Sequence, residues 1–458
     1  MTFSFLTLGC KLNFAESSAL GKTLIARGHT RAIKGSAPDL CIVNTCSVTD
    51  AADHKDRQAI RRLRRQYPEA TLIVTGCYAQ LKPGEIADIP GVDYVLGMHE
   101  KFDIPAFVEQ LEQQHETIHT SEIREVDTFC GARSKDDRTR CFLKVQDGCN
   151  YFCTYCTIPL ARGKSRNPSI ATLTDELRGA IEEGAKEIVL TGVNIGDFGR
   201  STGERFIDLL RALDDIEPSA VSRQPSGASG HSDKSRQPSG ASGHSDKSHQ
   251  SSDFRIRISS CEPNLLSDEV IDFVAHSRHF APHFHIPLQS GSNEVLRIMH
   301  RRYNRELFKE RVEHILRVMP QAFIGVDCMV GVRGETEECW EDYLDFIGSL
   351  PVSQLHVFTY SERRNTRMLE MDLHVVPQKE RERRSQLLHR VSEEKLQAFY
   401  AAHRGERGVV LWEAKRVPAT TEQPSESGWL MEGWTENYIR VCRPYDKAKI
   451  NTFEEVVI

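Results

Sequence analysis

A repeated order of a short β-rich run, a cysteine and a helical stretch near the start of the chain restricts the fold more than any other feature. The runs and the cysteines that follow them are Phe3–Leu8 with Cys10, Leu40–Val43 with Cys46, and Thr71–Val74 with Cys77. Alternating strands and helices predict a parallel sheet, and open sheets of this kind bind ligands at the carboxyl ends of their strands. We therefore expect an N-terminal parallel α/β domain, residues 1–118, whose three cysteines meet at one edge of the sheet.

The alternation restarts at about residue 141. The predicted strands are Cys141–Val145, Glu187–Thr191, Phe254–Ile258, His283–Ile286, Phe323–Val330 and Leu355–Tyr360, and helical stretches such as Ser267–His276, Arg305–Val318 and Glu335–Gly348 separate them. Six such units predict a partial or complete (β/α) barrel whose active site lies at the carboxyl ends of its strands. We expect the barrel domain to occupy residues 135–392, with a connecting helix at its end in the charged stretch Gln378–Tyr400.

A duplicated segment interrupts this pattern. Ser222–Lys234 reads SRQPSGASGHSDK, and Ser235–Lys247 repeats it residue for residue. The segment is rich in Ser, Gly and Pro and has no apolar residue larger than Ala, so it cannot bury enough surface to offset the entropy lost on ordering. We predict a disordered insertion at about residues 218–252. His231 and His244 could bind a metal, but a solvated linker is the favoured interpretation.

The last part of the chain changes to short strands separated by turn residues. The predicted strands are Val409–Trp412, Trp429–Met431, Tyr438–Val441 and Glu455–Ile458. This pattern predicts a small β-barrel, which we place at residues 395–458.

Composition restricts the class of protein. The chain has 458 residues, of which 39% are apolar and 27% charged, and its mean hydropathy is -0.44. No run approaches the ~18 apolar residues needed to cross a bilayer, and the first residues lack the pattern of a signal peptide. Thirteen cysteines without a secretory signal favour metal binding or redox chemistry in a reducing compartment. We therefore expect a cytoplasmic metalloprotein without a membrane partner.

The strongest chemical signal is DGCNYFCTYCTIP, which places Cys149, Cys153 and Cys156 directly after the first barrel strand. Three closely spaced thiolates can hold three irons of a [4Fe–4S] cluster and leave the fourth iron open to a ligand. The alternative is a zinc knuckle, which needs a fourth ligand nearby and more often has paired C-x₂-C motifs. A zinc-stabilised RNA-binding protein without catalysis therefore stays as a remote alternative.

Several motifs occur in the order typical of one enzyme family. They are TLGCKLNFAES at Thr7–Ser17, NTCSVT at Asn44–Thr49, VTGCYAQ at Val74–Gln80, the three-cysteine motif, HIPLQSGS at His285–Ser292 and GETEE at Gly334–Glu338. With them, nearly the whole chain resembles the radical S-adenosylmethionine methylthiotransferases. GWTENYIRV at Gly433–Val441 looks like the small RNA-binding barrel called TRAM, so residues 395–458 are identified as that domain.

The resemblance implies two [4Fe–4S] clusters and S-adenosylmethionine as cofactors. Cys149, Cys153 and Cys156 match the ligands of the cluster that binds S-adenosylmethionine and reduces it to a 5′-deoxyadenosyl radical. Cys10, Cys46 and Cys77 match the ligands of an auxiliary cluster implicated in sulfur delivery. The alternative for this second set is that its members are small buried hydrophobic residues. Cys41, Cys141 and Cys328 lie within strand-like runs and are interpreted as core residues.

Four further residues are candidates for binding S-adenosylmethionine, because they follow barrel strands. They are Gly192, Ser260, Glu262 and Gly331. Ordinary strand-to-helix turns have the same pattern, and no catalytic residue is assigned beyond the cluster cysteines.

Substrate choice rests on resemblance. The family acts on isopentenyladenosine or threonylcarbamoyladenosine in tRNA, or on an aspartate of a small-subunit ribosomal protein. GCYAQ, TIPLARGKSR at Thr157–Arg166 and TGVNIGDFG at Thr191–Gly199 look most like the threonylcarbamoyladenosine enzymes, which modify position 37 beside the anticodon. The implied partners are tRNA, a sulfur source and an electron donor such as flavodoxin or ferredoxin.

Local charge gives a second argument for RNA. The chain has a net charge of -6, but Arg133–Arg166 has eight basic residues against three acidic ones, and Lys55–Arg65 has six against one. Basic rims beside an active site suit tRNA, whereas the alternative for the second run is a solvated helix face. The terminal barrel has no net charge, and its aromatic residues Trp412, Trp429, Trp434 and Tyr438 suit either base stacking or a core.

Overall fold

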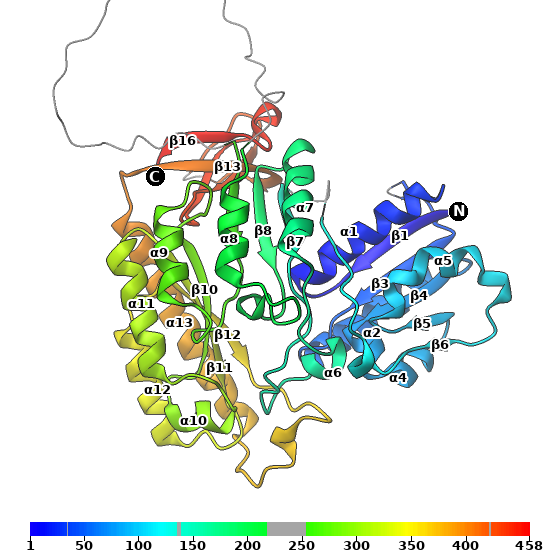
Figure 1. Ribbon diagram of the computed structural model, residues 1–458, viewed down its shortest axis with the longest axis horizontal. Coiled ribbons are helices and arrows are strands. Elements are labelled where there is room, and N and C mark those ends of the chain that lie inside the picture. Colours follow the sequence, from blue (N-terminus) through cyan, green and yellow to red (C-terminus); the bar gives the residue numbers. More distant parts are fainter. Residues whose placement is uncertain (34, 135–138, 218–252, 421–422) are drawn as a thin grey trace, which may run out of the picture.

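A computed structural model of the chain describes residues 1–33, 35–134, 139–217, 253–420 and 423–458 (Figure 1). The predicted disordered insertion at 218–252 lies outside the described residues. The described strands form an N-terminal parallel sheet, two parallel sheets in the centre and a C-terminal antiparallel sheet. This organisation confirms the predicted fold class. The three domain boundaries stay a prediction.

The N-terminal sheet has six parallel strands in the order β2-β1-β3-β4-β5-β6. Three of them follow the predicted runs: β1 (Thr2–Thr7), β3 (Leu40–Thr45) and β4 (Thr71–Gly76). The others are β2 (Thr30–Arg31), β5 (Tyr94–Leu96) and β6 (Ile118–His119). These were not predicted, because runs of two or three residues carry no periodic signal. The helices of this part are α1 (Lys11–Ala26), α2 (Asp50–Gln66), α3 (Cys77–Leu81), α4 (Pro83–Ala87) and α5 (Ile104–Glu109).

Buried side chains cover both faces of this sheet. Strand β3 is buried along its whole length, because Cys41 and Val43 face one core cluster while Leu40 and Ile42 face another. A continuous apolar run of this kind is typical of a parallel strand that is covered on both sides. The interpretation of Cys41 as a core residue agrees with its burial, and Cys141 and Cys328 are buried in the central core.

The central part forms a partial barrel of six parallel strands. One sheet contains β7 (Arg140–Lys144), β8 (Glu187–Thr191) and β9 (Arg255–Ile258), and the other contains β10 (His283–Gln289), β11 (Phe323–Val330) and β12 (Gln354–Thr359). Parallel bridges from Ile256 to Phe280 and from Ser260 to His285 join the two sheets. The predicted ranges agree with all six strands to within three residues at each end, and β8 and β11 have the predicted bounds.

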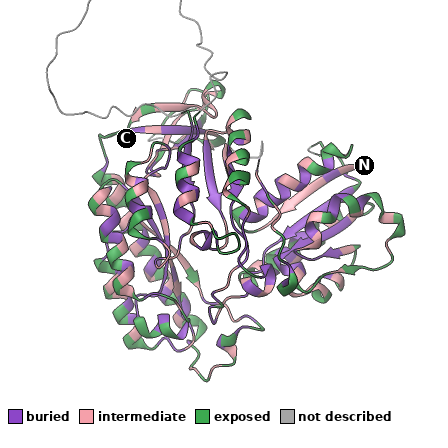
Figure 2. Cartoon of the chain, viewed as in Figure 1, coloured by how far each residue is buried: buried purple, intermediate pink, exposed green. Residues whose placement is uncertain are grey.

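Helices cover the outside of the barrel, where their outer faces are exposed while the strands carry buried residues (Figures 1 and 2). They are α7 (Ile170–Glu182), α8 (Phe206–Asp214), α9 (Asp268–His276), α10 (Asn293–Ile298), α11 (Arg305–Val318), α12 (Glu337–Ser349) and α13 (Gln378–Ala402), whereas the short helix α6 (Ile158–Arg162) packs against α3 of the N-terminal part. The sequence places a capping residue before four of them. Side chains of Ser169, Ser267, Asn304 and Thr336 each accept a hydrogen bond from a backbone N–H three residues later.

The C-terminal sheet is antiparallel, with the order β15-β14-β13-β16. Its strands are β13 (Arg407–Pro418), β14 (Trp429–Trp434), β15 (Arg440–Pro444) and β16 (Phe453–Val457). Strand β13 shifts register between Trp412 and Arg416, so the sheet curls, which is consistent with a small β-barrel. Trp412 is buried with Val410 and Met431, and it therefore serves the core rather than base stacking.

The C-terminal sheet lies at the end of the barrel where the strands begin (Figure 1). Arg255 and Arg257 of β9 donate hydrogen bonds to the backbone oxygens of Val409, Trp434, Thr435 and Glu436. None of the helices in the described ranges combines the length and the apolar character that crossing a bilayer requires.

Candidate active site

The three-cysteine loop connects β7 to α6 at the carboxyl end of the first barrel strand. Each of its three sulfur atoms accepts a hydrogen bond. Cys149 Sγ accepts from the backbone N–H of Tyr151 at 3.4 Å, and Cys156 Sγ accepts from that of Ile158 at 3.5 Å. Cys153 Sγ accepts from Arg301 Nη1 at 3.2 Å. Hydrogen bonds of this kind stabilise thiolates over thiols, which is the form that ligates iron.

Burial works in the opposite direction at this loop. Desolvation, with a smaller contribution from Cys153, raises the pKa of Cys149 to about 11. It also raises the pKa values of Cys153 and Cys156, and the mutual repulsion of the thiolates adds to the rise at Cys156. The three side chains are therefore close enough to repel one another as thiolates, and a bound cation would compensate that repulsion.

Arg301 connects this loop to a predicted binding residue. Its side chain is 4% exposed, and it donates to Cys153 Sγ and to the carboxylate of Glu262. Its remaining contacts are with the hydroxyls of Tyr155 at 3.4 Å and Tyr303 at 3.0 Å. Burial raises the pKa of Glu262, and Arg301 opposes this rise. The sequence contains no signal for this role, because Arg301 lies in a run of charged residues 145 positions or more beyond the cysteine loop.

The second set of cysteines meets at the carboxyl ends of three neighbouring strands, as predicted. Cys10 follows β1, Cys46 follows β3 and Cys77 begins α3 directly after β4. A Cβ atom at Gly9 would lie 2.8 Å from Cys46 Sγ, which places the backbone before Cys10 against that thiol. Burial, Cys77 and Cys10 together raise the pKa of Cys46 to about 12.

In the described ranges, no three or more His, Cys, Asp or Glu side chains are placed so that they could hold one metal ion. A [4Fe–4S] cluster binds its thiolates at separate irons and spaces them more widely than a single ion does. The donor chemistry of both cysteine sets fits a cluster, since each set consists of thiols alone.

A buried cluster of charges lies between the N-terminal sheet and the barrel. We call it the ion-pair cluster, and its members are Glu16, Lys101, Lys144, Asp147, Arg162 and Arg166. Glu16 of α1 accepts from Lys101 Nζ at 2.7 Å, Lys144 Nζ at 2.9 Å and Arg162 Nη1 at 2.9 Å. Burial raises the pKa of Cys77, but Arg162 and Lys101 act to lower it. The ion-pair cluster, with four cations and two carboxylates, thus favours negative charge at the neighbouring cysteines.

The basic residues of Arg133–Arg166 were expected to form a rim that faces RNA. This prediction is wrong for those of its described residues that form ion pairs within the protein. Lys144, Arg162 and Arg166 are buried in the ion-pair cluster, and Arg133 pairs with Glu176 and Glu183. Arg140 pairs with Glu413 of the C-terminal sheet at 3.1 Å. Lys164 is exposed, and Lys135 and Arg138 lie outside the described residues. A local excess of positive charge in sequence does not reveal partners that come from distant segments.

The run Lys55–Arg65 lies on α2 and presents exposed basic side chains. Lys55, Arg61, Arg62 and Arg65 are exposed, whereas Arg64 pairs with Asp93 at 2.6 Å. A role of this face in RNA binding stays a prediction, because a solvated helix face would look the same.

A cavity of about 580 Å³ opens inside the barrel and extends to the N-terminal sheet. Its lining includes Gly9, Cys10 and Lys11 from the turn after β1 and the start of α1, Thr191 and Gly192 at the end of β8, Ser259 and Ser260 after β9, and residues of β10, β11 and β12. A volume of this size suits a small-molecule or nucleoside ligand. Of the described candidates for S-adenosylmethionine binding, Gly192 and Ser260 line the cavity, whereas Glu262 and Gly331 do not.

Gly192 lies where a larger side chain would not fit. A Cβ atom there would come within 2.6 Å of Ile195 Cγ2 and 3.0 Å of Gln146 Oε1. The same Gln146 oxygen accepts hydrogen bonds from the backbone N–H groups of Val193 and Asn194 and so orders the turn after β8. Gly331 has a φ of +75°, and a Cβ atom there would overlap the side chain of Arg381 from α13. Packing therefore explains that glycine without a ligand.

Polar side chains of three strands face this cavity. His285 of β10 and Asp327 of β11 are joined by a hydrogen bond of 2.7 Å, and the ring of His356 of β12 lies 4.9 Å from that of His285. Burial, followed by repulsion from His285, lowers the pKa of His356. Tyr438 enters from the C-terminal sheet and accepts a hydrogen bond from Arg140 at 2.9 Å.

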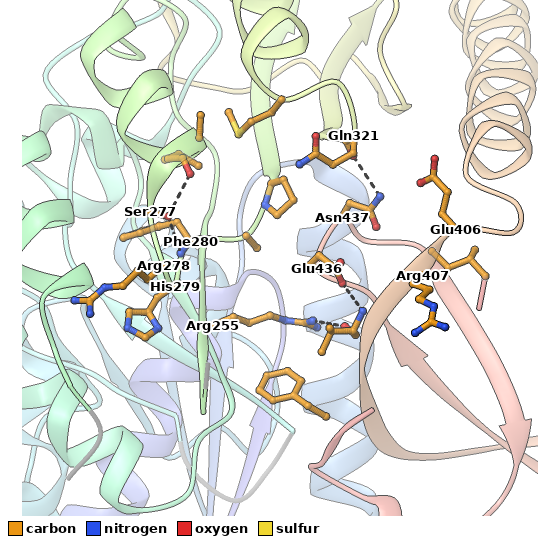
Figure 3. A pocket seen from close by; sticks show the side chains of 18 residues that line it. Arg255, Ser277, Arg278, His279, Phe280, Gln321, Glu406, Arg407, Glu436 and Asn437 are labelled. Atoms are coloured by element: carbon orange, nitrogen blue, oxygen red, sulfur yellow. Dashed lines mark hydrogen bonds between the residues drawn. The ribbon is translucent and has the colours of Figure 1, made fainter. Parts of the chain in front are cut away.

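A second cavity, of about 420 Å³, lies at the opposite end of the barrel, where the C-terminal sheet is attached (Figure 3). Figure 3 shows Arg255 reaching across it, while Glu436 accepts from the backbone N–H of Val409 and Asn437 donates to Gln321 O. His279 also lines this cavity, and its ring stacks on Phe254. The hydrogen bonds here hold two parts of the chain together, far from the cysteine loops.

Comparisons with known proteins agree with the placement of these motifs. A family model described as the Radical SAM superfamily matches residues 143–347, and one described as Uncharacterized protein family UPF0004 matches residues 2–97. The chain is 34% identical over 444 residues to "Threonylcarbamoyladenosine tRNA methylthiotransferase MtaB" of Bacillus subtilis, covering 96% of this chain and 90% of that relative. It is 31% identical to the protein of the same name from Aquifex aeolicus, covering 97% of each.

A second type of relative is also similar. The chain is 31% identical to "tRNA-2-methylthio-N(6)-dimethylallyladenosine synthase" of Thermobifida fusca, covering 87% of this chain and 76% of that relative. Among solved structures, the radical S-adenosylmethionine methyltransferase TsrM from Kitasatospora setae superposes with a TM-score of 0.56 at 14% identity, covering 78% of this chain and 72% of that one. This last likeness concerns the fold alone.

Proposed function

Since the chain belongs to the radical S-adenosylmethionine methylthiotransferase family, we propose that it converts N6-threonylcarbamoyladenosine at position 37 of tRNA to its 2-methylthio derivative. Enzymatic activity follows from the family itself. The use of S-adenosylmethionine with one [4Fe–4S] cluster follows from the radical S-adenosylmethionine domain at residues 143–347. The particular nucleoside, the second cluster and the residues named below are our proposal.

Cys149, Cys153 and Cys156 are proposed to hold the cluster that binds S-adenosylmethionine. The hydrogen bonds that reach all three sulfur atoms support this assignment. When bound, the cluster and its cofactor supply the one-electron cleavage of S-adenosylmethionine and the methyl group of the product. The protein positions the substrate and excludes water from the reacting atoms.

Cys10, Cys46 and Cys77 are proposed to hold an auxiliary cluster. The observation that carries the proposal is their meeting at the carboxyl ends of adjacent strands, with Cys10 lining the same cavity as the strand ends of the barrel. A sulfur source bound at this edge would face the interior where the barrel residues Gly192 and Ser260 lie. The positive excess of the ion-pair cluster beside Cys77 supports a site of negative charge there.

The substrate proposal rests on the relatives and on sequence motifs. Two similar relatives carry names with threonylcarbamoyladenosine, and GCYAQ and TGVNIGDFG resemble those enzymes. The similarity to the Thermobifida relative favours dimethylallyladenosine as the second candidate. The further partners proposed are an electron donor such as flavodoxin or ferredoxin, and a source of sulfur.

The first experiment is anaerobic purification and reconstitution, followed by iron and sulfide analysis and an absorbance spectrum. We expect about eight irons in a brown protein. Cys153→Ala should keep about half of the iron and form no 5′-deoxyadenosine, while Cys46→Ala should lose about half of the iron and still form it. Cys141→Ala is the matched control, because this buried cysteine lies in the barrel core and should keep all the iron. A colourless protein that contains zinc would refute the proposed radical S-adenosylmethionine activity.

The second experiment identifies the nucleoside. The chain is expressed in a bacterial strain that lacks its own enzyme for this modification, and the tRNA is digested and analysed by mass spectrometry. We expect 2-methylthio-threonylcarbamoyladenosine to appear with the wild-type chain and not with Cys153→Ala. If the methylthio form of isopentenyladenosine appears instead, the substrate is isopentenyladenosine and the proposal of threonylcarbamoyladenosine is wrong.

A further inference from the structure

Lys11 is the first residue of α1, directly after Cys10, and its side chain lies in the cavity of the barrel. The residue is accessible to solvent although the N-terminal sheet and the barrel surround the cavity that it lines. Among the described residues, none is found within hydrogen-bond or ion-pair distance of its ammonium group. A cation that lines a cavity and has no partner among the described residues is available to an anionic ligand.

The other charged groups in the cavity already have partners. Arg140 donates to the hydroxyl of Tyr438 and pairs with Glu413. Arg257 donates to two backbone oxygens of the C-terminal sheet and pairs with Glu187 at 3.0 Å. The carboxylate of Asp327 is bound to His285. Among the cations that line the cavity, Lys11 is therefore available to bind an anionic group of a ligand.

The remaining walls suit a planar base. Phe14, Phe142 and Phe358 line the cavity, and Phe358 is 45% exposed although it lies on a barrel strand. Enzymes that act on a base take it out of its stack and hold it against aromatic or apolar side chains. An adenosine with a charged substituent would thus find an apolar wall for its ring and one cation for its charge.

We propose that Lys11 determines substrate specificity by binding the carboxylate of the threonylcarbamoyl group on the target adenosine. The inference rests on the proposed function and adds the residue that distinguishes this nucleoside from one with an uncharged substituent. An isopentenyl group has no anion to offer, so it would leave Lys11 unpaired. A charge-assisted hydrogen bond is strong enough to separate the two substrates by about tenfold to hundredfold.

The test measures binding of a fluorescent anticodon stem–loop RNA to the reconstituted holoenzyme by anisotropy. Two RNAs are compared: one carries threonylcarbamoyladenosine, and in the other the carboxylate has been cyclised to a neutral hydantoin. We expect the wild-type holoenzyme to bind the carboxylate form about tenfold or more tightly. Lys11→Met should remove this preference, and Lys11→Arg should retain it. Lys22→Met is the matched control on the same helix, since Lys22 is partly exposed, pairs with Glu183 and does not line the cavity.

The iron content of every variant and its formation of 5′-deoxyadenosine without RNA are measured in the same preparations. The proposal is overturned if wild type binds both RNAs equally, or if Lys11→Met keeps the wild-type preference. It is also overturned if Lys11→Met raises the KM for S-adenosylmethionine and leaves the preference between the RNAs intact. Should Lys11→Met lose iron, Lys11→Arg and the wild-type comparison of the two RNAs still decide.

Failure of the proposed function has a different signature. In that case the wild-type enzyme makes no methylthio product on the tRNA with threonylcarbamoyladenosine, whatever residue stands at position 11. A wild-type enzyme that makes the product but does not need the carboxylate refutes the role of Lys11 alone.

Discussion

Replacing Glu16 by Gln should destabilise the junction between the N-terminal sheet and the barrel. The Glu16 carboxylate is fully buried and accepts hydrogen bonds from three cations that come from different segments. Its removal leaves those cations with Asp147 as the remaining carboxylate of the ion-pair cluster. Breaking a buried ion pair by removing one partner costs about 3–5 kcal/mol, and we expect about 3 kcal/mol because the Gln amide keeps one acceptor.

The matched control is Glu109→Gln in the same N-terminal part. Glu109 pairs with Arg27 at 2.7 Å, but the two side chains are 46% and 41% exposed. Exposed pairs of this kind contribute about 0–1 kcal/mol because water and salt screen them. The assay is urea unfolding of the anaerobic holoenzyme, followed by circular dichroism and by the absorbance of the clusters. With an m-value of about 3 kcal/mol per molar urea, the midpoint of Glu16→Gln falls by about 1 M.

The pH dependence gives an independent check of the same reasoning. Burial alone would raise the pKa of Glu16, but Arg162, Lys101 and Lys144 hold it well below the ordinary value of 4.5. The stabilisation by this carboxylate is therefore complete above pH 4.5 and is lost as the pH falls through the lowered folded-state pKa. The difference between wild type and Glu16→Gln should shrink below pH 4.5. Midpoints of the two Gln variants that agree within about 0.2 M at neutral pH would refute this account.

Three further predictions concern single residues. Burial opposes ionisation of Glu187, but Arg255, Arg257 and Arg140 lower its pKa to about 2, so acidification from pH 4.5 towards 2 should release the C-terminal sheet. Glu187→Gln should raise the rate of trypsin cleavage of that sheet at neutral pH about tenfold or more. An unchanged rate of cleavage contradicts the role of Glu187. Arg301→Gln removes the positive charge beside Cys153 Sγ and should lower the reduction potential of the adjacent cluster by about 60 mV or more. The potential is measured by a redox titration followed by electron paramagnetic resonance. An unchanged potential would mean that Arg301 is not near a cluster. Gly331→Ala should lower stability by about 1–3 kcal/mol, measured by urea unfolding, because of its positive φ and the overlap with Arg381; a wild-type midpoint would argue against this packing.

The fold was largely predictable from neighbours in sequence. The strands of the barrel follow apolar β-rich runs such as Phe323–Val330, which is a strand over the same residues in the structure. The short strands β2, β5 and β6 escaped prediction, because a pairing of two or three residues depends on the strand beside them. The convergence of Cys10, Cys46 and Cys77 also followed from topology alone, since the carboxyl ends of adjacent parallel strands lie at one edge.

Charged residues behaved differently. Lys144, Arg162 and Arg166 suggest an RNA-binding rim when read along the chain, but Glu16 and Asp147 neutralise them in the interior. The contact of Arg301 with Cys153 joins residues 148 positions apart, so no local sequence pattern could predict it.

Periodicity and motif spacing were enough to predict the order of strands and helices, the two sets of thiols and the family, because both are properties of adjacent residues. Which charges are paired and which, like Lys11, face a cavity became visible in the folded chain. The physical reason is that the electrostatic environment of a side chain depends on distances in space, and those distances are set by how remote segments pack.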